Sequence, residues 1–141
     1  MCLLDQVVGW DAERVTCTSG SHRAADNPLR AGGRLGIACG IEYAAQAIAV
    51  HGALVAGALD AKRGASPTAG SPVAGFLVGV RGVRFHATHL DVQDDLVCDA
   101  VRVAGDRGTA LYEFELRGGA MRLLSGRATV VFDAGERLQA L

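Results

Sequence analysis

The feature that most constrains the fold is one long, almost uncharged stretch in the first half of the chain. Residues 35–59 carry a single formal charge, at Glu42, and consist mostly of alanine, glycine and aliphatic residues. This pattern predicts a helix over residues 37–62. Because the helix is apolar on nearly all sides, we expect it to be buried on most of its circumference. The rest of the chain must therefore supply something that surrounds a helix.

The same stretch is long enough to cross a bilayer, so a membrane span has to be weighed against a core helix. Glu42, Gln46 and His51 lie in its interior, and no aromatic or basic belt flanks it. Polar groups at those positions are costly in lipid. We therefore expect a core helix and no membrane span.

The segments on either side of the helix predict β structure. Residues 1–10 and 14–18 resemble a hairpin around a turn at 11–13, followed by a loop at 19–33 that is rich in Gly, Ser, Asp, Asn and Pro. After a second loop at 64–72, four meandering strands are predicted at 73–89, 95–104, 109–116 and 121–132. This α+β order fits a curved antiparallel sheet that wraps the helix and leaves edge strands to pair between subunits.

Composition narrows the class of protein. A chain of 141 residues fits one domain over residues 1–141. The 14 basic and 15 acidic residues give a net charge of −1, and aromatic residues are few, which argues against a nucleic-acid partner. The four cysteines form no CxxC pair and no signal peptide is evident, so we expect free thiols in a reducing, cytoplasmic compartment.

The candidate chemistry lies at the start of the helix, in the sequence GIEYAAQA at residues 40–47. Glu42 and Gln46 are one turn apart and share a face. Just upstream, near Ile37 and Ala38, lie free backbone amides and the positive end of the helix dipole. A carboxyl group beside such donors suits an acid–base site. Equally, Glu42 could do no more than satisfy the amides of its own helix.

This motif resembles that of the 3-hydroxyacyl-ACP dehydratases, in which an acidic residue is followed four positions later by Gln. With MCLLD at 1–5, NPLR at 27–30 and GFL at 75–77, the chain more narrowly resembles the ApeP-like hotdog dehydratases linked to aryl polyene gene clusters. The resemblance covers nearly the whole chain and implies a hotdog fold, with a long central helix wrapped by a curved antiparallel sheet. Members commonly have a short segment ahead of the first strand, so we expect the natural N-terminus to be longer.

The resemblance also implies a reaction, namely dehydration of a 3-hydroxyacyl thioester on acyl carrier protein or CoA to a trans-2-enoyl thioester, with no cofactor. In the family a histidine is the base, the helix carboxylate is the acid, and backbone amides polarise the thioester carbonyl. Carried over, Glu42 is the acid, the amides of Ile37 and Ala38 are the donors, and Gln46 orients the site. Burial in an apolar tunnel would raise the pKa of Glu42. We expect a homodimer or a pair with a related hotdog chain.

The histidine is where this sequence departs from the family pattern. Dehydratases place it just before the helix in a His-Phe-Pro or His-Pro motif, and the matching position here is Asn27, followed by Pro28. Asparagine cannot act as a base, so we assign Asn27 a substrate-binding role only. His22, in the same loop, is our candidate replacement. The alternative is that His22 is a solvated loop residue.

The other charged and polar candidates carry weaker predictions. His51 faces the side of the helix opposite Glu42, so core packing or a hydrogen bond to the sheet is expected. His86 and His89 lie three apart in a strand pattern and point to opposite faces, so no metal pair is expected. The segment ahead of the helix, which we call the entrance loop, holds three arginines that could bind a pantetheine phosphate or an acidic carrier surface, or be ordinary surface charge: Arg23, Arg30 and Arg34.

Two other functions stay open. Hotdog thioesterases use a carboxylate on this helix to activate water and need no histidine. A non-catalytic acyl-binding subunit would keep the tunnel and lack a base. We do not expect a serine hydrolase, because the chain has no Gly-x-Ser-x-Gly motif.

Overall fold

The computed structural model describes residues 2–62, 75–106 and 108–132. The predicted helix and strands are all present, although β3 ends at Phe85 and not at 89; the predicted loop at 64–72 lies outside the described residues. In chain order the elements are β1 (Gln6–Trp10), β2 (Arg14–Ser19), the 3-10 turns η1 (Ser21–Arg23) and η2 (Ile37–Cys39), α1 (Gly40–Lys62), β3 (Gly75–Phe85), β4 (Leu96–Gly105), β5 (Thr109–Gly118) and β6 (Met121–Phe132).

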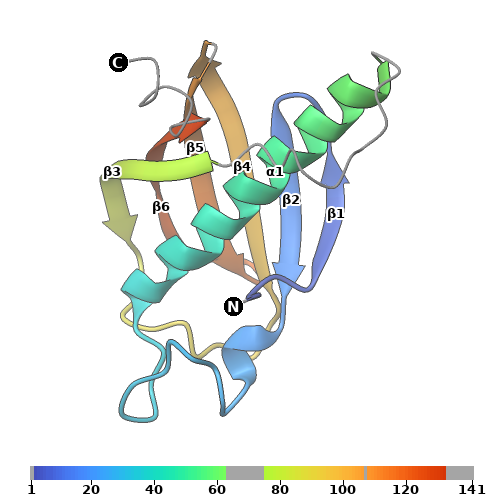
Figure 1. The fold of residues 1–141 in the computed structure, drawn as a ribbon. Helices are drawn as coiled ribbons and strands as arrows, with labels where there is room; N and C mark the ends of the chain where they lie inside the picture. Colours follow the sequence, from blue (N-terminus) through green and yellow to red (C-terminus); the bar gives the residue numbers. More distant parts are fainter. Residues whose placement is uncertain (1, 63–74, 107, 133–141) are drawn as a thin grey trace.

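The six strands form one antiparallel sheet in the order β1-β2-β4-β5-β6-β3, and α1 lies across one face of it (Figure 1). The predicted meander holds for β4, β5 and β6, but β3 pairs with β6 at the edge of the sheet and not with β4. The connection after β3 instead runs along the segment ahead of α1. There the Ile37 N–H donates to the Thr88 carbonyl at 3.1 Å, and the Leu90 N–H donates to the Leu35 carbonyl at 2.8 Å.

The N-terminal segment also differs from its prediction, because β1 begins at Gln6 and not at residue 1. The chain before it contacts the helix and the loop that follows β2. The Leu3 N–H donates to Gln46 Oε1 at 2.8 Å, and the Leu3 carbonyl accepts from the hydroxyl of Ser21 at 2.6 Å. These polar contacts hold the segment against α1 and outside the regular ladder of the sheet.

The core lies between the concave face of the sheet and one side of α1. Alternation in β5 sends every second side chain to the helix, as the sequence pattern predicts. These four side chains are at most 3% exposed: Ala110, Tyr112, Phe114 and Leu116. The buried side of α1 is formed by Tyr43, Ala44, Ala47, Ile48 and His51.

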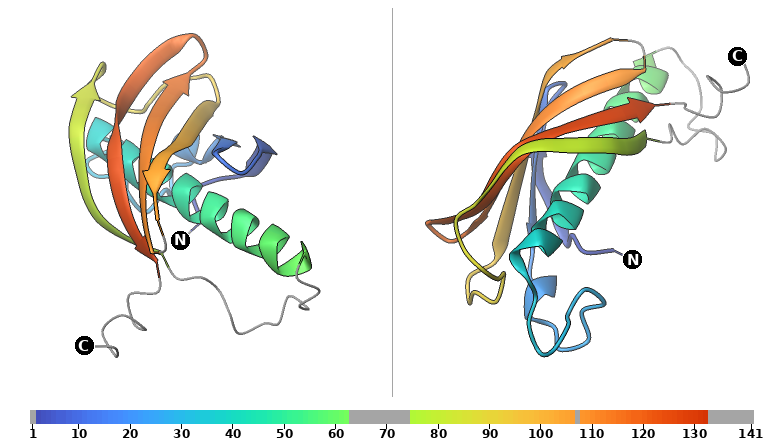
Figure 2. Two further views of the ribbon diagram at one scale, coloured as in Figure 1. Left: turned by 90° about the horizontal axis from the view of Figure 1, so that it is seen from above. Right: turned by 90° about the vertical axis from the view of Figure 1, so that its left-hand side faces the viewer.

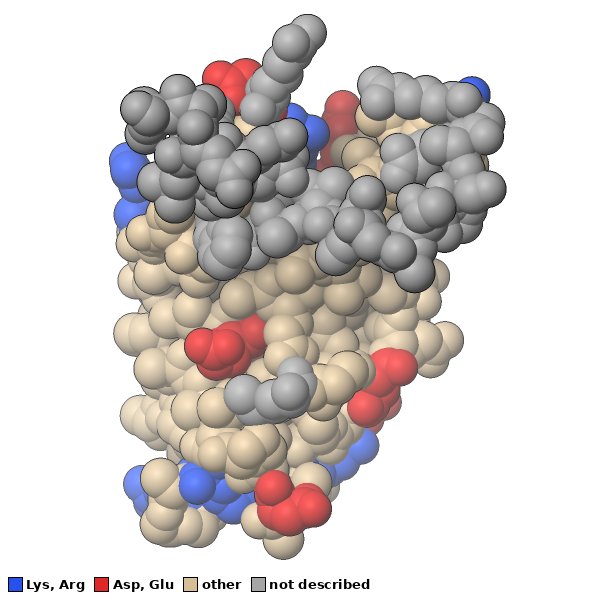
Figure 3. Space-filling view, in the orientation of Figure 1, with Lys and Arg blue, Asp and Glu red and all other residues tan. Residues whose placement is uncertain are grey.

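The other side of α1 is open. Figure 2 shows the helix on one face of the curved sheet, and on the side of the helix away from the sheet Glu42, Ala49 and Ala53 are exposed. The prediction of a helix buried on most of its circumference therefore does not hold for a single chain, because the sheet covers only one side. Residues Ile37–Leu59 are also apolar and long enough for a membrane span by length and composition alone. In Figure 3 the part of this face that is not covered by grey atoms is largely uncharged, with an acidic group within it.

Candidate active site

Glu42 lies in the first turn of α1 and points to the open side of the helix. The carboxylate has no hydrogen bond or ion pair within the described residues, so it does not cap its own helix. This observation does not support the alternative that Glu42 only satisfies the amides of its own helix. The apolar tunnel predicted around Glu42 is not closed by this chain alone, because the residue is exposed.

The position of Glu42 relative to the sheet depends on how closely the helix approaches the sheet at Gly40. A Cβ atom at Gly40 would collide with the Leu124 side chain and lie 3.0 Å from Leu116 Cδ2. Glycine therefore lets the helix start directly against β5 and β6. This contact positions the first turn of α1, and with it Glu42.

The two predicted oxyanion donors have different surroundings. The Ile37 N–H is already used, since it donates to the Thr88 carbonyl at 3.1 Å. Ala38 is exposed, and its N–H has no acceptor among the described residues. Of the pair, only the Ala38 amide remains available to a bound carbonyl, one turn ahead of Glu42.

Gln46 lies one turn after Glu42, as predicted, but one of its contacts is structural. Its Oε1 accepts from the Leu3 N–H at 2.8 Å and so ties the N-terminal segment to the helix. The sequence motif gave no sign of this contact, because the partner lies 43 positions earlier in the chain.

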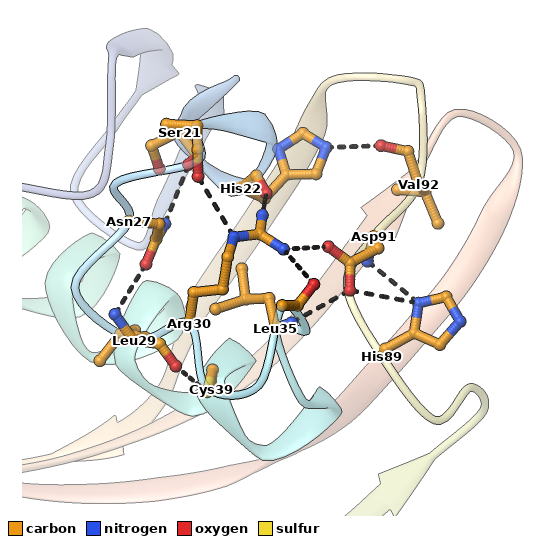
Figure 4. Close-up of polar contacts among 12 residues, drawn as sticks. Ser21, His22, Asn27, Leu29, Arg30, Leu35, Cys39, His89, Asp91 and Val92 are labelled. Atoms are coloured by element: carbon orange, nitrogen blue, oxygen red, sulfur yellow. Dashed lines mark hydrogen bonds and ion pairs between the residues drawn. The ribbon is translucent and has the colours of Figure 1, made fainter.

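Asn27, at the position of the family histidine, is built into the loop ahead of the helix. Its side chain is 6% exposed, and Nδ2 donates to the Ser21 carbonyl at 2.9 Å and to the Tyr43 hydroxyl at 3.2 Å. Its Oδ1 accepts from the Leu29 N–H at 2.9 Å, and Figure 4 shows the side chain between Ser21 and Leu29. Asn27 therefore links the loop to the same turn of α1 that carries Glu42.

His22 is fully buried and is not a solvated loop residue. Its Nε2 lies 3.0 Å from the Val92 carbonyl and 2.9 Å from the Asp94 carbonyl, so Nε2 carries the proton and donates to both. Burial lowers the pKa of His22, partly offset by the bond to Val92. No hydrogen bond joins His22 to Glu42 within the described residues. The joint role of His22 and Glu42 therefore has no direct contact behind it in this structure and stays a prediction.

The remaining histidines do not form a pair with Glu42 either. His51 is 1% exposed and bonded to Tyr112 and the Asp11 carbonyl, on the buried side of α1 as predicted. His86 is exposed at the end of β3. His89 Nδ1 accepts from the Asp91 N–H at 3.2 Å, and Figure 4 shows its ring beside Asp91. Within the described residues, no cluster of three or more His, Cys, Asp or Glu could hold a metal ion.

The entrance loop is held by an ion pair that the sequence did not reveal. Arg30 Nη1 lies 2.7 Å from Asp91 Oδ1, and Nη2 donates to the His22 carbonyl at 2.6 Å (Figure 4). The other carboxylate oxygen of Asp91 accepts from the Leu35 N–H at 3.0 Å. Arg23 is likewise paired, with Asp95 at 2.6 Å. Arg23 and Arg30 line a hollow of about 560 Å³ beside this loop.

We expect Asp91→Asn to weaken the fold in a pH-dependent way. The Leu35 amide and then the Arg30 guanidinium hold the pKa of Asp91 below its ordinary value of 3.8. Its contribution to stability is therefore present above 3.8 and is lost as pH falls through the lower, folded-state pKa. Thermal unfolding should show the variant about 1 kcal/mol less stable at pH 7.

The control for this experiment is Asp26→Asn, an exposed aspartate in the loop that carries Arg30, the ion-pair partner of Asp91. Its stability should follow that of the wild type at every pH. If the gap between Asp91→Asn and the wild type stayed constant down to pH 2, the carboxylate would not be the group responsible.

A long helix on a six-stranded antiparallel sheet is the hotdog fold, which the chain shares with solved structures of a dehydratase and of thioesterases. The chain belongs to the ApeP-like family, whose model, described as ApeP dehydratase, matches residues 1–140. No curated protein matches the chain significantly.

Among solved structures, the chain is similar to the dehydratase heterocomplex ApeI:P from Xenorhabdus doucetiae, with a TM-score of 0.77 and 25% identity over 99% of this chain and 88% of that one. A hypothetical thioesterase from Streptococcus pneumoniae TIGR4, solved with coenzyme A, has a TM-score of 0.64 and 10% identity over 91% and 87%. A thioesterase from Haemophilus influenzae has a TM-score of 0.61 and 9% identity over 90% and 76%. The last two show the fold alone.

Proposed function

We propose that this chain is the carboxylate-bearing subunit of a 3-hydroxyacyl-thioester dehydratase, with the acyl group carried on acyl carrier protein or CoA. The observation that carries the proposal is Glu42, an exposed carboxylate with no partner among the described residues, at the start of an apolar helix. The free Ala38 amide one turn away would polarise the thioester carbonyl. Membership of the ApeP-like dehydratase family supports the reaction class.

In this reaction a base removes the proton from Cα, the electron pair forms the Cα–Cβ double bond, and the Cβ hydroxyl leaves as water. Glu42 donates the proton to that hydroxyl. The base must be a second group within reach of Cα. Both ring nitrogens of His51 are hydrogen-bonded, to the Tyr112 hydroxyl and the Asp11 carbonyl. The Nδ1 atom of His22 is unbonded but buried, with no hydrogen bond to Glu42 among the described residues, so neither histidine suits this role.

We therefore place the base on a second hotdog chain that carries the histidine in its own pre-helix loop. A pair of identical chains would set Asn27 where that histidine is needed. The similarity to a dehydratase heterocomplex supports such a pairing. So does the edge strand β3, whose outer edge has no neighbour in the sheet and whose Leu77, Val78 and Val80 are 41%, 60% and 38% exposed.

A thioesterase is the second candidate, because one specific observation favours it. Glu42 is unpartnered among the described residues and has no histidine bonded to it there, which suits a carboxylate that activates water for attack on the thioester carbonyl. The products would then be the free 3-hydroxy acid and the thiol. The fold by itself is compatible with both reactions.

The test is mass spectrometry of a 3-hydroxyacyl-ACP incubated with this chain alone, and with this chain plus a hotdog dehydratase chain that keeps the pre-helix histidine. We expect loss of one water from the acyl group only in the mixture. Water loss by this chain alone, abolished by His22→Ala, would overturn the assignment of the base to a partner. Release of the free acid would establish the thioesterase. No turnover in either incubation would indicate a non-catalytic binding subunit and overturn the proposal.

Asn27→His provides a second measurement on this chain alone. The family position then holds a base, and water loss should appear without any partner if two copies of the chain pair. A melting curve must accompany it, because Asn27 is buried and bonded to Tyr43.

We also propose a cytoplasmic location. The four cysteines are free thiols, including Cys17 and Cys98, which lie directly opposite each other on β2 and β4. A reducing compartment keeps such a pair unlinked. Fractionation of the native cells would test it.

A further inference from the structure

A second polar cluster lies halfway along α1, on the side facing away from Glu42. His51 is 1% exposed, with Nδ1 2.6 Å from the Tyr112 hydroxyl and Nε2 2.9 Å from the Asp11 carbonyl. A carbonyl only accepts, so Nε2 carries the proton and Nδ1 accepts from the Tyr112 O–H. These hydrogen bonds hold the side chains of His51 and Tyr112 in one arrangement, so the two side chains form a rigid wall beside which a molecule can bind.

That wall lines a cavity of about 220 Å³ between α1 and strands β4 and β5. Its apolar lining is formed by Val55, Ala56 and Leu59, which follow His51 along the same helix. At about 30 Å³ per water-sized group, the space holds roughly seven such groups. The cavity therefore fits a short hydrocarbon chain or a single aromatic ring.

The cavity also has one cation at its rim that lacks an acidic partner among the described residues. Arg102 lies directly opposite Tyr112 in the β4–β5 register and is only partly exposed. Its guanidinium has no ion pair or hydrogen bond within the described part of the chain. The guanidinium lies over Gly105, where a Cβ atom would stand 2.7 Å from Arg102 Nη2. Glycine at that position thus leaves room for the guanidinium beside the cavity.

We propose that this cavity binds a small apolar monocarboxylate, with the carboxylate on Arg102 and the hydrocarbon along Val55, Ala56 and Leu59. Guanidinium and carboxylate match in geometry and charge, and the pairing is strongest in a partly buried site. Asp106 stands on the same rim and repels a dianion such as phosphate more strongly than a monocarboxylate. Glu42 and His51 are nine residues apart and, at about 100° per residue, on opposite sides of the helix. The proposal is therefore independent of the proposed dehydratase.

The probe is sodium octanoate, whose hydrocarbon chain matches the cavity in size. Binding to the full chain is followed by titration calorimetry and by the fluorescence of Trp10, the single tryptophan, which lines an adjoining hollow of about 250 Å³ together with Val55 and Leu59. We expect saturable binding to the wild type. Arg102→Gln should weaken the affinity at least tenfold, and neutral octanol should bind wild type at least tenfold more weakly than octanoate does.

Two matched variants test whether the octanoate binds beside Arg102 and not elsewhere on the chain. Arg122→Gln removes an arginine that is paired with Glu115 on the opposite face of the sheet, and octanoate affinity should not change. Glu42→Gln should also bind octanoate as the wild type does. Unchanged affinity in Arg102→Gln, no saturable binding to the wild type, or loss of binding in Glu42→Gln would each overturn the proposal, the last by placing the octanoate in the thioester site.

Discussion

Glu42→Gln should abolish dehydration by the reconstituted two-chain enzyme while leaving the fold intact. The amide has the same shape as the acid but cannot donate the proton that the departing hydroxyl needs, and general acid catalysis typically contributes about 10²–10⁴-fold in rate. Because Glu42 is exposed and has no bonded partner among the described residues, stability should change by less than about 0.5 kcal/mol. Initial rates of water loss, measured by mass spectrometry, give the effect.

The matched control is Glu13→Gln, an exposed glutamate between β1 and β2. It should keep full activity. Glu42→Asp should retain part of the activity, since it keeps an acid on a shorter side chain. A Glu42→Gln enzyme with more than a tenth of the wild-type rate would contradict the role of Glu42 as the proton donor.

Leu124→Ala should produce the largest loss of stability among the single substitutions considered. Leu124 is fully buried and packs under Gly40, where the helix starts against the sheet. Removing its side chain leaves a cavity beneath the first turn of α1, at a cost of about 3 kcal/mol. Thermal unfolding followed by circular dichroism should show a midpoint lower by about 10 °C.

Met121→Ala, at the start of the same strand, is the control for burial because Met121 is 55% exposed. Its stability should stay within about 0.5 kcal/mol of the wild type. Equal losses in the two variants would mean that the contact between Leu124 and the helix start is not what stabilises this region.

The open side of α1 shows why a hydrophobic pattern can be read correctly and still mislead. The helix is apolar all round, as the alanine-rich sequence predicts, yet the sheet buries only the side that carries Tyr43 and Ile48. The hydrophobic pattern indicates how much of the helix surface is covered in the assembled protein, including any part covered by another chain. It does not say which chain provides them.

His22 illustrates the limit for the candidate site. Its place in a loop five residues ahead of Asn27 suggested a replacement base, but its hydrogen-bond partners are the carbonyls of Val92 and Asp94, 70 and 72 positions later in the chain. No local pattern indicates such partners. The same holds for Asp91, whose bonds to Arg30 and Leu35 depend on how two distant loops meet.

Local patterns along the chain are enough to predict the long helix, the antiparallel strands and the carboxylate at the helix start. Each of these follows from periodicity among neighbouring residues, either 3.6 per turn or two per strand repeat. The packed chain was needed to show that β3 lies beside β6, that His22 is buried and bonded, and that Ile37 has lost its free amide while Ala38 keeps one. Those outcomes depend on hydrogen bonds between segments far apart in the chain, which compete for the same donors and acceptors once the chain is packed.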